Sequence, residues 1–310
     1  LIANGDTLTL NAVDLSGKTM NISMLGTGSL VIVSDGSNHN FSNISVTKGT
    51  GTVTLDVNIN KDISATNINN IIDKFDVASG STLTLSYSQF NGHTGVGTGT
   101  LKLSDTSLTG TQIKSVNVAS TNAIDLTNVT TISSSTMAQM LEVVQNTGAV
   151  FTTAANYAVT ISDTSSASDV NIVAGDTNGV VTATIVDGAV TTTLNAIGNV
   201  ATTDVITFTT TDTSVDASDL VALAVKVDTL GVNSVTTITE AYNTASVATV
   251  VTNALNITGN TELVTITGGA ISATDANTIL GATSGIVTAT VSADTAANLN
   301  SALTNATTGT

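Results

Sequence analysis

The chain has 310 residues and a formal net charge of −16, and only 10% of its residues are charged and 3% aromatic. Residues 1–114 hold eight acids and six lysines, whereas residues 115–310 hold fifteen acids and the single cation Lys226. Such an acidic surface repels phosphate backbones and anionic membranes, which argues against nucleic-acid binding. The lack of Cys excludes disulfides and thiolate metal sites, and no apolar run is long enough for membrane insertion.

The first 62 residues predict short strands separated by turns. The segments DTLTLNAV, TMNISM, SLVIVSDG, NISVTKG and GTVTLDVNI alternate apolar residues with Thr, Ser or Asn, and Gly or Asp-Gly interrupts them. This pattern is typical of strands, and no helical period precedes Ile63. We therefore predict a β-rich N-terminal region over 1–62. Its opening residues lack the basic and apolar parts of a signal peptide, which is expected of a start inside a longer protein or of a processed terminus.

Five related decapeptides follow, and each predicts the start of a helix. They are ISATNINNII (63–72), ISSSTMAQML (132–141), SSASDVNIVA (165–174), VDASDLVALA (215–224) and ISATDANTIL (271–280). The fourth residue is always Thr or Ser, and apolar residues at positions six, nine and ten give a helix one buried stripe. A hydroxyl at the fourth position can accept a bond from a free amide of the first turn. The predicted N-caps are Thr66, Ser135, Ser168, Ser218 and Thr274.

Between residues 63 and 150 we predict irregular alternation of strands and helices. Helices are expected from Thr66 to about Phe75 and over ISSSTMAQMLEVVQNTG, which Gly148 would close. Strands are expected at STLTLSYS, TLKLSD and IKSVNVAS, with a loop or a turn-rich segment over 91–100.

Residues 151–310 predict a regular repeat. Strands are expected near Ala158, Val180, Asp204, Ser234, Leu263 and Gly285. Two linker types alternate between them, and the second ends in TLNAI, VTNAL or LNSAL, so the unit is a pair of strand–helix turns of roughly fifty residues. One turn cannot bury its own apolar face, and helical linkers of this length favour parallel pairing. The sequence therefore predicts an α/β solenoid, leucine-rich-repeat-like over 151–310.

Paired threonines recur at matching positions of these predicted strands. They are Thr182/Thr184, Thr207/Thr209, Thr237/Thr239, Thr265/Thr267 and Thr288/Thr290. Alternation would turn their hydroxyls away from the apolar residues between them. One hypothesis is a flat face that binds ice, glycans or a partner. The other is ordinary solvated strand residues, because Thr favours strands.

Aspartates at the predicted turns raise the question of a metal. Asp163 with Asp187, or Asp212 with Asp216, could share a Ca²⁺ ion, but calcium needs six or more converging oxygens and no EF-hand loop or GGxGxD repeat is present. Asp169, Asp219 and Asp275 have a simpler expected role, which is to stabilise helix N-termini by their charge. We therefore expect no cofactor, with Ca²⁺ as the alternative.

The two histidines give little support to a catalytic site. His39 and His93 each lie in an Asn/Gly/Ser-rich segment, which predicts surface loops, and no G-x-S-x-G motif is present. The chain also has no Trp and no Arg, the groups that line most sugar-cleaving grooves. We predict a non-enzymatic protein.

The words SDTSSASDV, TDTSVDASDL, ISATDANTIL and GIVTATVSADTAANLNSAL resemble repeat arrays of giant acidic secreted surface proteins. Cyanobacteria and other aquatic bacteria carry such proteins as adhesins, surface layers or motility-associated components. The resemblance extends over about 155–310, is weaker over 63–150 and is absent over 1–60. It implies an extracellular structural or adhesive role on the cell surface. Self-association into a filament or lattice is the expected partnership, and glycan, ice or partner binding by an adhesin module is the alternative.

Overall fold

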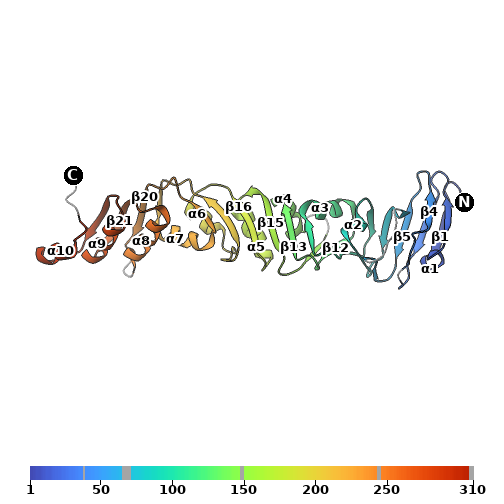
Figure 1. The fold of residues 1–310 in the computed structure, drawn as a ribbon, viewed down its shortest axis with the longest axis horizontal. Coiled ribbons are helices and arrows are strands. Elements are labelled where there is room, and N and C mark those ends of the chain that lie inside the picture. The colour runs from blue at the N-terminus through green and yellow to red at the C-terminus, as the bar shows by residue number, and fades with distance from the viewer. Residues whose placement is uncertain (38, 65–70, 147–149, 243–245, 307–310) are drawn as a thin grey trace. The chain divides into compact units, whose positions relative to one another are not determined.

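A computed structural model describes residues 1–37, 39–64, 71–146, 150–242 and 246–306. The chain is a mixed α/β protein of parallel-stranded sheets and short helices, and it divides into two compact units. The N-terminal unit comprises residues 1–162 and 176–180, and the C-terminal unit comprises residues 163–175 and 181–310. Within each unit the elements follow one another in chain order (Figure 1). Among the described residues, no helix has both the length and the apolar character needed to cross a membrane.

The N-terminal unit is built mainly from strands. One sheet has the order β1 (Thr7–Asn11), β3 (Ser29–Val33), β5 (Val53–Val57), β7 (Lys74–Val77), β9 (Thr94–Gly97). A second has the order β14 (Phe151–Thr153), β12 (Ala123–Leu126), β10 (Thr100–Leu103), β8 (Thr82–Leu85), β6 (Lys61–Asp62). In addition β2 (Met20–Ser23) pairs with β4 (Ile44–Thr47), and β13 (Thr131–Ser135) pairs with β11 (Ser107–Thr109) and with the start of β15 (Ala158–Ser165). The helices are α1 (Ala12–Leu15), α2 (Tyr87–Phe90), α3 (Gly110–Ala119) and α4 (Met137–Val144).

Parallel registers at nearly constant sequence offsets stack the apolar residues of this unit. In the first sheet Leu10 pairs with Ile32, Ile32 with Leu55 and Leu55 with Phe75. Ile32, Leu55 and Phe75 are all buried. Because side chains alternate across a strand, this register turns one apolar file inward.

The C-terminal unit alternates strands with longer helices. Its strands are β16 (Val181–Ile185), β17 (Val205–Thr209), β18 (Ser214–Asp216), β19 (Thr229–Gly231), β20 (Thr237–Ala241), β21 (Leu263–Ile271) and β22 (Val287–Val291). Its helices are α5 (Ala167–Asp176), α6 (Val190–Ala196), α7 (Ala217–Lys226), α8 (Val247–Thr258), α9 (Ala273–Ala282) and α10 (Ala296–Ala302). Strands β16, β17 and β19 pair in that order, as do β18, β20, β21 and β22. From α6 to α10 each helix packs on the next.

The strands predicted after residue 155 and the helix around Met137 are confirmed. Residues 113–120, predicted as a strand, instead lie mainly in α3, because Thr109 and Gln112 form a capping box and Ile113 and Val116 bury one helix face. One-turn helices α1 and α2 and strand β9 were not predicted.

The expected helix from Thr66 is wrong at its end, since β7 begins at Lys74. Its start at residues 65–70, like Gly148, lies outside the described residues. The predicted boundaries after residues 62 and 150 stay predictions.

Candidate functional sites

The helix N-caps lie one or two residues from their predicted positions. The caps are Thr136 for α4, Asp216 for α7 and Ser272 for α9, and Ser166 Oγ accepts the Asp169 amide at the start of α5. The predictions of Ser135, Ser168, Ser218 and Thr274 are therefore wrong, and Thr66 lies outside the described residues.

The signal for the correct cap was spacing. The side-chain oxygen of a cap accepts a hydrogen bond from the backbone amide three residues later. A Ser, Thr or Asp that stands three residues before an Asp or Gln therefore identifies the cap. The predicted placement of Asp169, Asp219 and Asp275 in first helical turns is confirmed.

The proposed calcium pairs are used as backbone acceptors or lie exposed. Asp212 Oδ2 accepts the Val190 amide at the start of α6 at 2.8 Å, and Asp216 accepts two amides of α7. Asp163 and Asp187 are exposed. In the described part of the chain, no three or more His, Asp or Glu side chains converge in a metal-binding arrangement.

The predicted threonine pairs do not line up pair by pair across the strands. Thr184 pairs with Thr207, and Thr207 pairs with Thr229. In the second sheet Thr239 pairs with Thr265 and Thr265 with Thr288. The other predicted positions face different residues: Thr182–Val205, Thr209–Gly231, Thr237–Leu263, Thr267–Ala241 and Thr290–Ala270. Each sheet therefore carries one file of three threonines. In the first sheet, the second threonine of the β16 pair lies opposite the first threonine of the β17 pair, and in the second sheet β21 has a bulge before Ala270.

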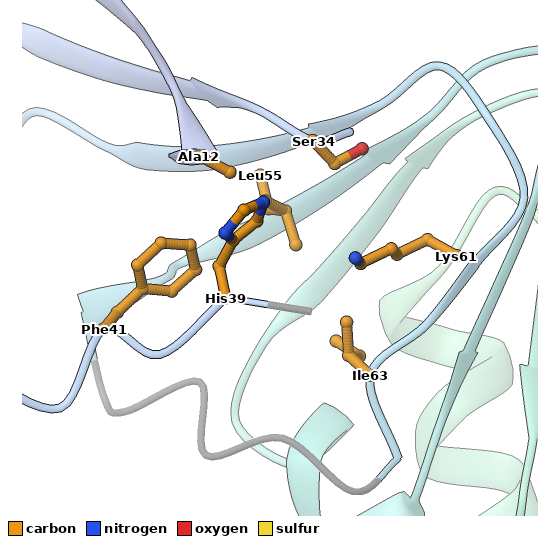
Figure 2. Close-up of a pocket in the computed structure, with 7 residues that line it drawn as sticks. All are labelled: Ala12, Ser34, His39, Phe41, Leu55, Lys61 and Ile63. Atoms are coloured by element: carbon orange, nitrogen blue, oxygen red, sulfur yellow. The ribbon is translucent and has the colours of Figure 1, made fainter. Parts of the chain in front are cut away.

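A small, partly open cavity lies in the N-terminal unit. Its volume is about 10 Å³, and its lining residues are Ala12, Ser34, His39, Phe41, Leu55, Lys61 and Ile63. Ser34 directly follows β3, Leu55 belongs to β5 and Lys61 opens β6, so the two larger sheets of this unit both contribute to its wall. Figure 2 shows the Lys61 side chain extended so that its Nζ lies toward His39 and Leu55.

The polar groups of this cavity have unequal surroundings. His39 Nε2 lies 2.6 Å from Asp35 Oδ1, and this bond holds the pKa of Asp35 below its usual value. Burial lowers the pKa of Lys61, and the nearby Asp35 charge opposes that shift. Lys61 is 6% exposed and Ser34 is 8% exposed, yet among the described residues Lys61 Nζ and Ser34 Oγ have no hydrogen-bond partner.

Neither histidine is a simple surface group. His39 is buried, so its predicted surface position is wrong, and His93 stacks obliquely on Phe75 with ring centroids 5.4 Å apart. The cavity beside Lys61 could not be predicted from the sequence, because its lining residues come from four separate segments. The residue types of Ser34 and Lys61 give no hint of their burial.

The outermost strands of the two units expose residues at core positions. Leu8 of β1 is 39% exposed, although its register partner Leu30 of β3 is 0% exposed. In β22, Val287 and Val291 are half-buried, whereas their partners Val264 and Ile271 are fully buried. An apolar strand with a free edge can pair with another strand.

The chain matches no protein-family model, and no curated protein or solved structure matches it significantly.

Proposed function

We propose that this chain is a solenoid segment of a non-enzymatic extracellular structural protein, which extends a stalk, surface layer or filament by end-to-end association. Parallel pairing at nearly constant sequence offsets supports a solenoid. Strands that alternate with packed helices in the C-terminal unit support a leucine-rich-repeat-like form there. The resemblance to acidic secreted repeat arrays supports the cell-surface location.

The observation that carries end-to-end association is the exposure of core positions on β1 and β22. Inside each unit, a strand covers the apolar residues of its parallel neighbour. Among the described residues, the outer edge of β22 has unpaired backbone groups and half-buried apolar side chains, as an interior strand would have if its neighbour were removed. The outer edge of β1 likewise leaves Leu8 partly exposed, and a neighbouring strand would cover it. A second copy that places β1 beside β22 would repeat a contact that the chain already makes many times.

Sedimentation and electron microscopy of the purified chain at rising concentration test this proposal. The chain should form filaments, and Leu8→Lys or Val287→Lys should leave monomers because a charge blocks the strand edge. Val118→Lys is the matched control, since Val118 is 78% exposed on α3 and belongs to neither edge strand, and it should assemble normally. Monomers alone at high concentration of the unsubstituted chain would contradict the proposal.

A second candidate function is binding of glycan, ice or a partner by the file Thr239, Thr265 and Thr288. The parallel register supports it by aligning three hydroxyl-bearing side chains across neighbouring strands, about 4.8 Å apart. A glycan array and a thermal-hysteresis assay test it. Thr265→Val should abolish any signal, and Thr290→Val, outside the file, should not. Blank assays with the unsubstituted chain would remove this candidate.

A further inference from the structure

The cavity beside Lys61 presents hydrogen-bond donors without acceptors. An ammonium group has three donors and no acceptor, and the Ser34 hydroxyl adds one more donor together with its own acceptor lone pairs. Both groups are buried, and neither has a hydrogen-bond partner in the part of the chain that the structure describes. A buried donor without a partner costs free energy, and a charged one costs more. The cavity therefore favours an occupant that accepts hydrogen bonds and carries negative charge.

The cavity wall distinguishes between such occupants. Four of its seven lining residues are apolar, namely Ala12, Phe41, Leu55 and Ile63. The third polar residue, His39, already bonds to Asp35 through Nε2. A buried water could donate to the Ser34 hydroxyl and accept from Lys61, but it would bring no negative charge to the buried ammonium group, whereas a monatomic anion accepts from both side chains and supplies that charge. At about 10 Å³ the cavity has room for one small occupant such as a single ion.

We propose that this cavity is a halide site, in which one chloride ion lies between Lys61 Nζ and Ser34 Oγ. The ion balances the buried ammonium charge and accepts from both side chains. It also has a structural consequence. Ser34 follows β3 of one sheet and Lys61 belongs to β6 of the other, so the bound ion joins the two sheets of the N-terminal unit. Chloride thereby stabilises this unit by binding only its folded state.

Thermal unfolding of the full chain tests the site. The Tm is measured in gluconate, which is too large to enter the cavity, and again after chloride replaces gluconate at constant ionic strength. We expect the Tm of the unsubstituted chain to rise by about 2–6 °C. Lys61→Met, which keeps the side-chain length and removes the charge, should abolish the rise, and Ser34→Ala should reduce it. Lys18→Met removes an equal charge from an exposed position and should keep the full rise. An equal rise in Lys61→Met and the unsubstituted chain would overturn the proposal.

Crystals of the unsubstituted chain soaked in bromide give a second readout, which does not depend on a variant that folds. An anomalous peak within hydrogen-bond reach of Lys61 Nζ and Ser34 Oγ is the expected result. A water molecule at that position without anomalous signal would overturn the proposal, as would a halide bound only at the protein surface.

Discussion

Two nearly identical segments of the C-terminal unit have different neighbours. Strand β16 reads VTATI and strand β22 reads VTATV, and their residues lie 106 positions apart. Val181, Ala183 and Ile185 of β16 are buried, whereas the equivalent residues of β22 are half-buried. The helices that follow differ in the same way, since α6 buries Val190 and Thr193 and α10 buries no residue.

Other contacts of the two segments are the same. The backbone N–H of Asn199 donates to Asn171 Oδ1 at 2.6 Å, and the backbone N–H of Asn305 donates to Asn277 Oδ1 at the same distance. The hydroxyls of Thr177 and Thr283 each accept the amide two residues later, from Gly179 and Gly285 respectively. The residues next to each of the two strands thus make matching hydrogen bonds. The comparison teaches that burial here comes from the following repeat and not from the strand's own sequence.

The largest expected effect comes from a charge at equivalent positions in the two segments. Val181→Asp should cost more than about 4 kcal/mol of unfolding free energy, because it buries an unpaired carboxylate. Val287→Asp should cost less than about 1 kcal/mol, because water reaches that side chain. Urea unfolding, at a protein concentration where the chain is monomeric, measures the change in unfolding free energy for both variants. Equal costs would contradict the comparison, and assembly by Val287→Asp would contradict end-to-end association.

Substitution of Gly179 and Gly285, which precede β16 and β22 at equivalent positions, tests their contacts with the preceding repeat. A Cβ on Gly179 would lie 2.2 Å from the Tyr157 carbonyl oxygen, and one on Gly285 would lie 2.1 Å from that of Glu262. Gly179→Ala and Gly285→Ala should therefore cost similar amounts, about 1–3 kcal/mol each, by urea unfolding.

Gly198→Ala is the control for both, since open space surrounds that position and the loss should stay below about 0.5 kcal/mol. A much smaller cost for Gly285→Ala than for Gly179→Ala would show that the two segments differ on this side also.

The asparagine bond should matter more at the end segment than in the interior. Asn277→Ala removes the acceptor of the Asn305 backbone amide, a bond worth about 1 kcal/mol that lies just after helix α10, and α10 itself buries no residue. Hydrogen exchange should then show loss of protection throughout α10, whereas Asn171→Ala should affect α6 less. Asn277→Asp keeps an accepting oxygen and is the control. Protection of α10 that survives Asn277→Ala would contradict this role.

Strand positions after residue 155 could be predicted because alternation and Gly-bounded length are local signals. Residues 113–120 were misassigned because IKSVNVAS alternates over a few residues, while the Thr109–Gln112 capping box that decides for helix α3 lies before them. The caps of α7 and α9 were missed for a related reason. Several Ser, Thr and Asp residues stand close together there, and only the three-residue spacing to Asp219 or Asp275 identifies Asp216 and Ser272.

The candidate sites were harder to predict because they depend on register and burial. Thr207 pairs with Thr184 and not with Thr182, a choice that is set by packing between repeats and not by the strand sequences alone. Lys61 resembles any surface lysine in the sequence, and only the fold places its amine in an apolar cavity beside Ser34. Such juxtapositions arise from residues more than twenty positions apart.

The smallest expected effect concerns two carboxyl groups of the C-terminal unit, one interior and one at the end. Burial, and then the charge of Asp216, raise the pKa of Glu240, so the fold favours its protonated form. The bond from Asn298 lowers the pKa of the exposed Asp294, so the fold favours its charged form. The stability linked to Glu240 is present below its unfolded pKa and is lost as pH rises through its folded pKa, and Asp294 behaves in the opposite way.

Glu240→Gln should therefore stabilise the chain at pH 7, by less than about 1 kcal/mol, and have no effect below about pH 4. Its amide oxygen can still accept the Ser218 amide, which Glu240 Oε2 accepts at 3.0 Å. Asp294→Asn is the matched variant at the end segment and should destabilise the chain at pH 7. Tm values between pH 4 and pH 7 measure both differences. The same sign for the two variants at pH 7 would mean that the interior and end carboxyl groups do not differ in the way that their surroundings imply.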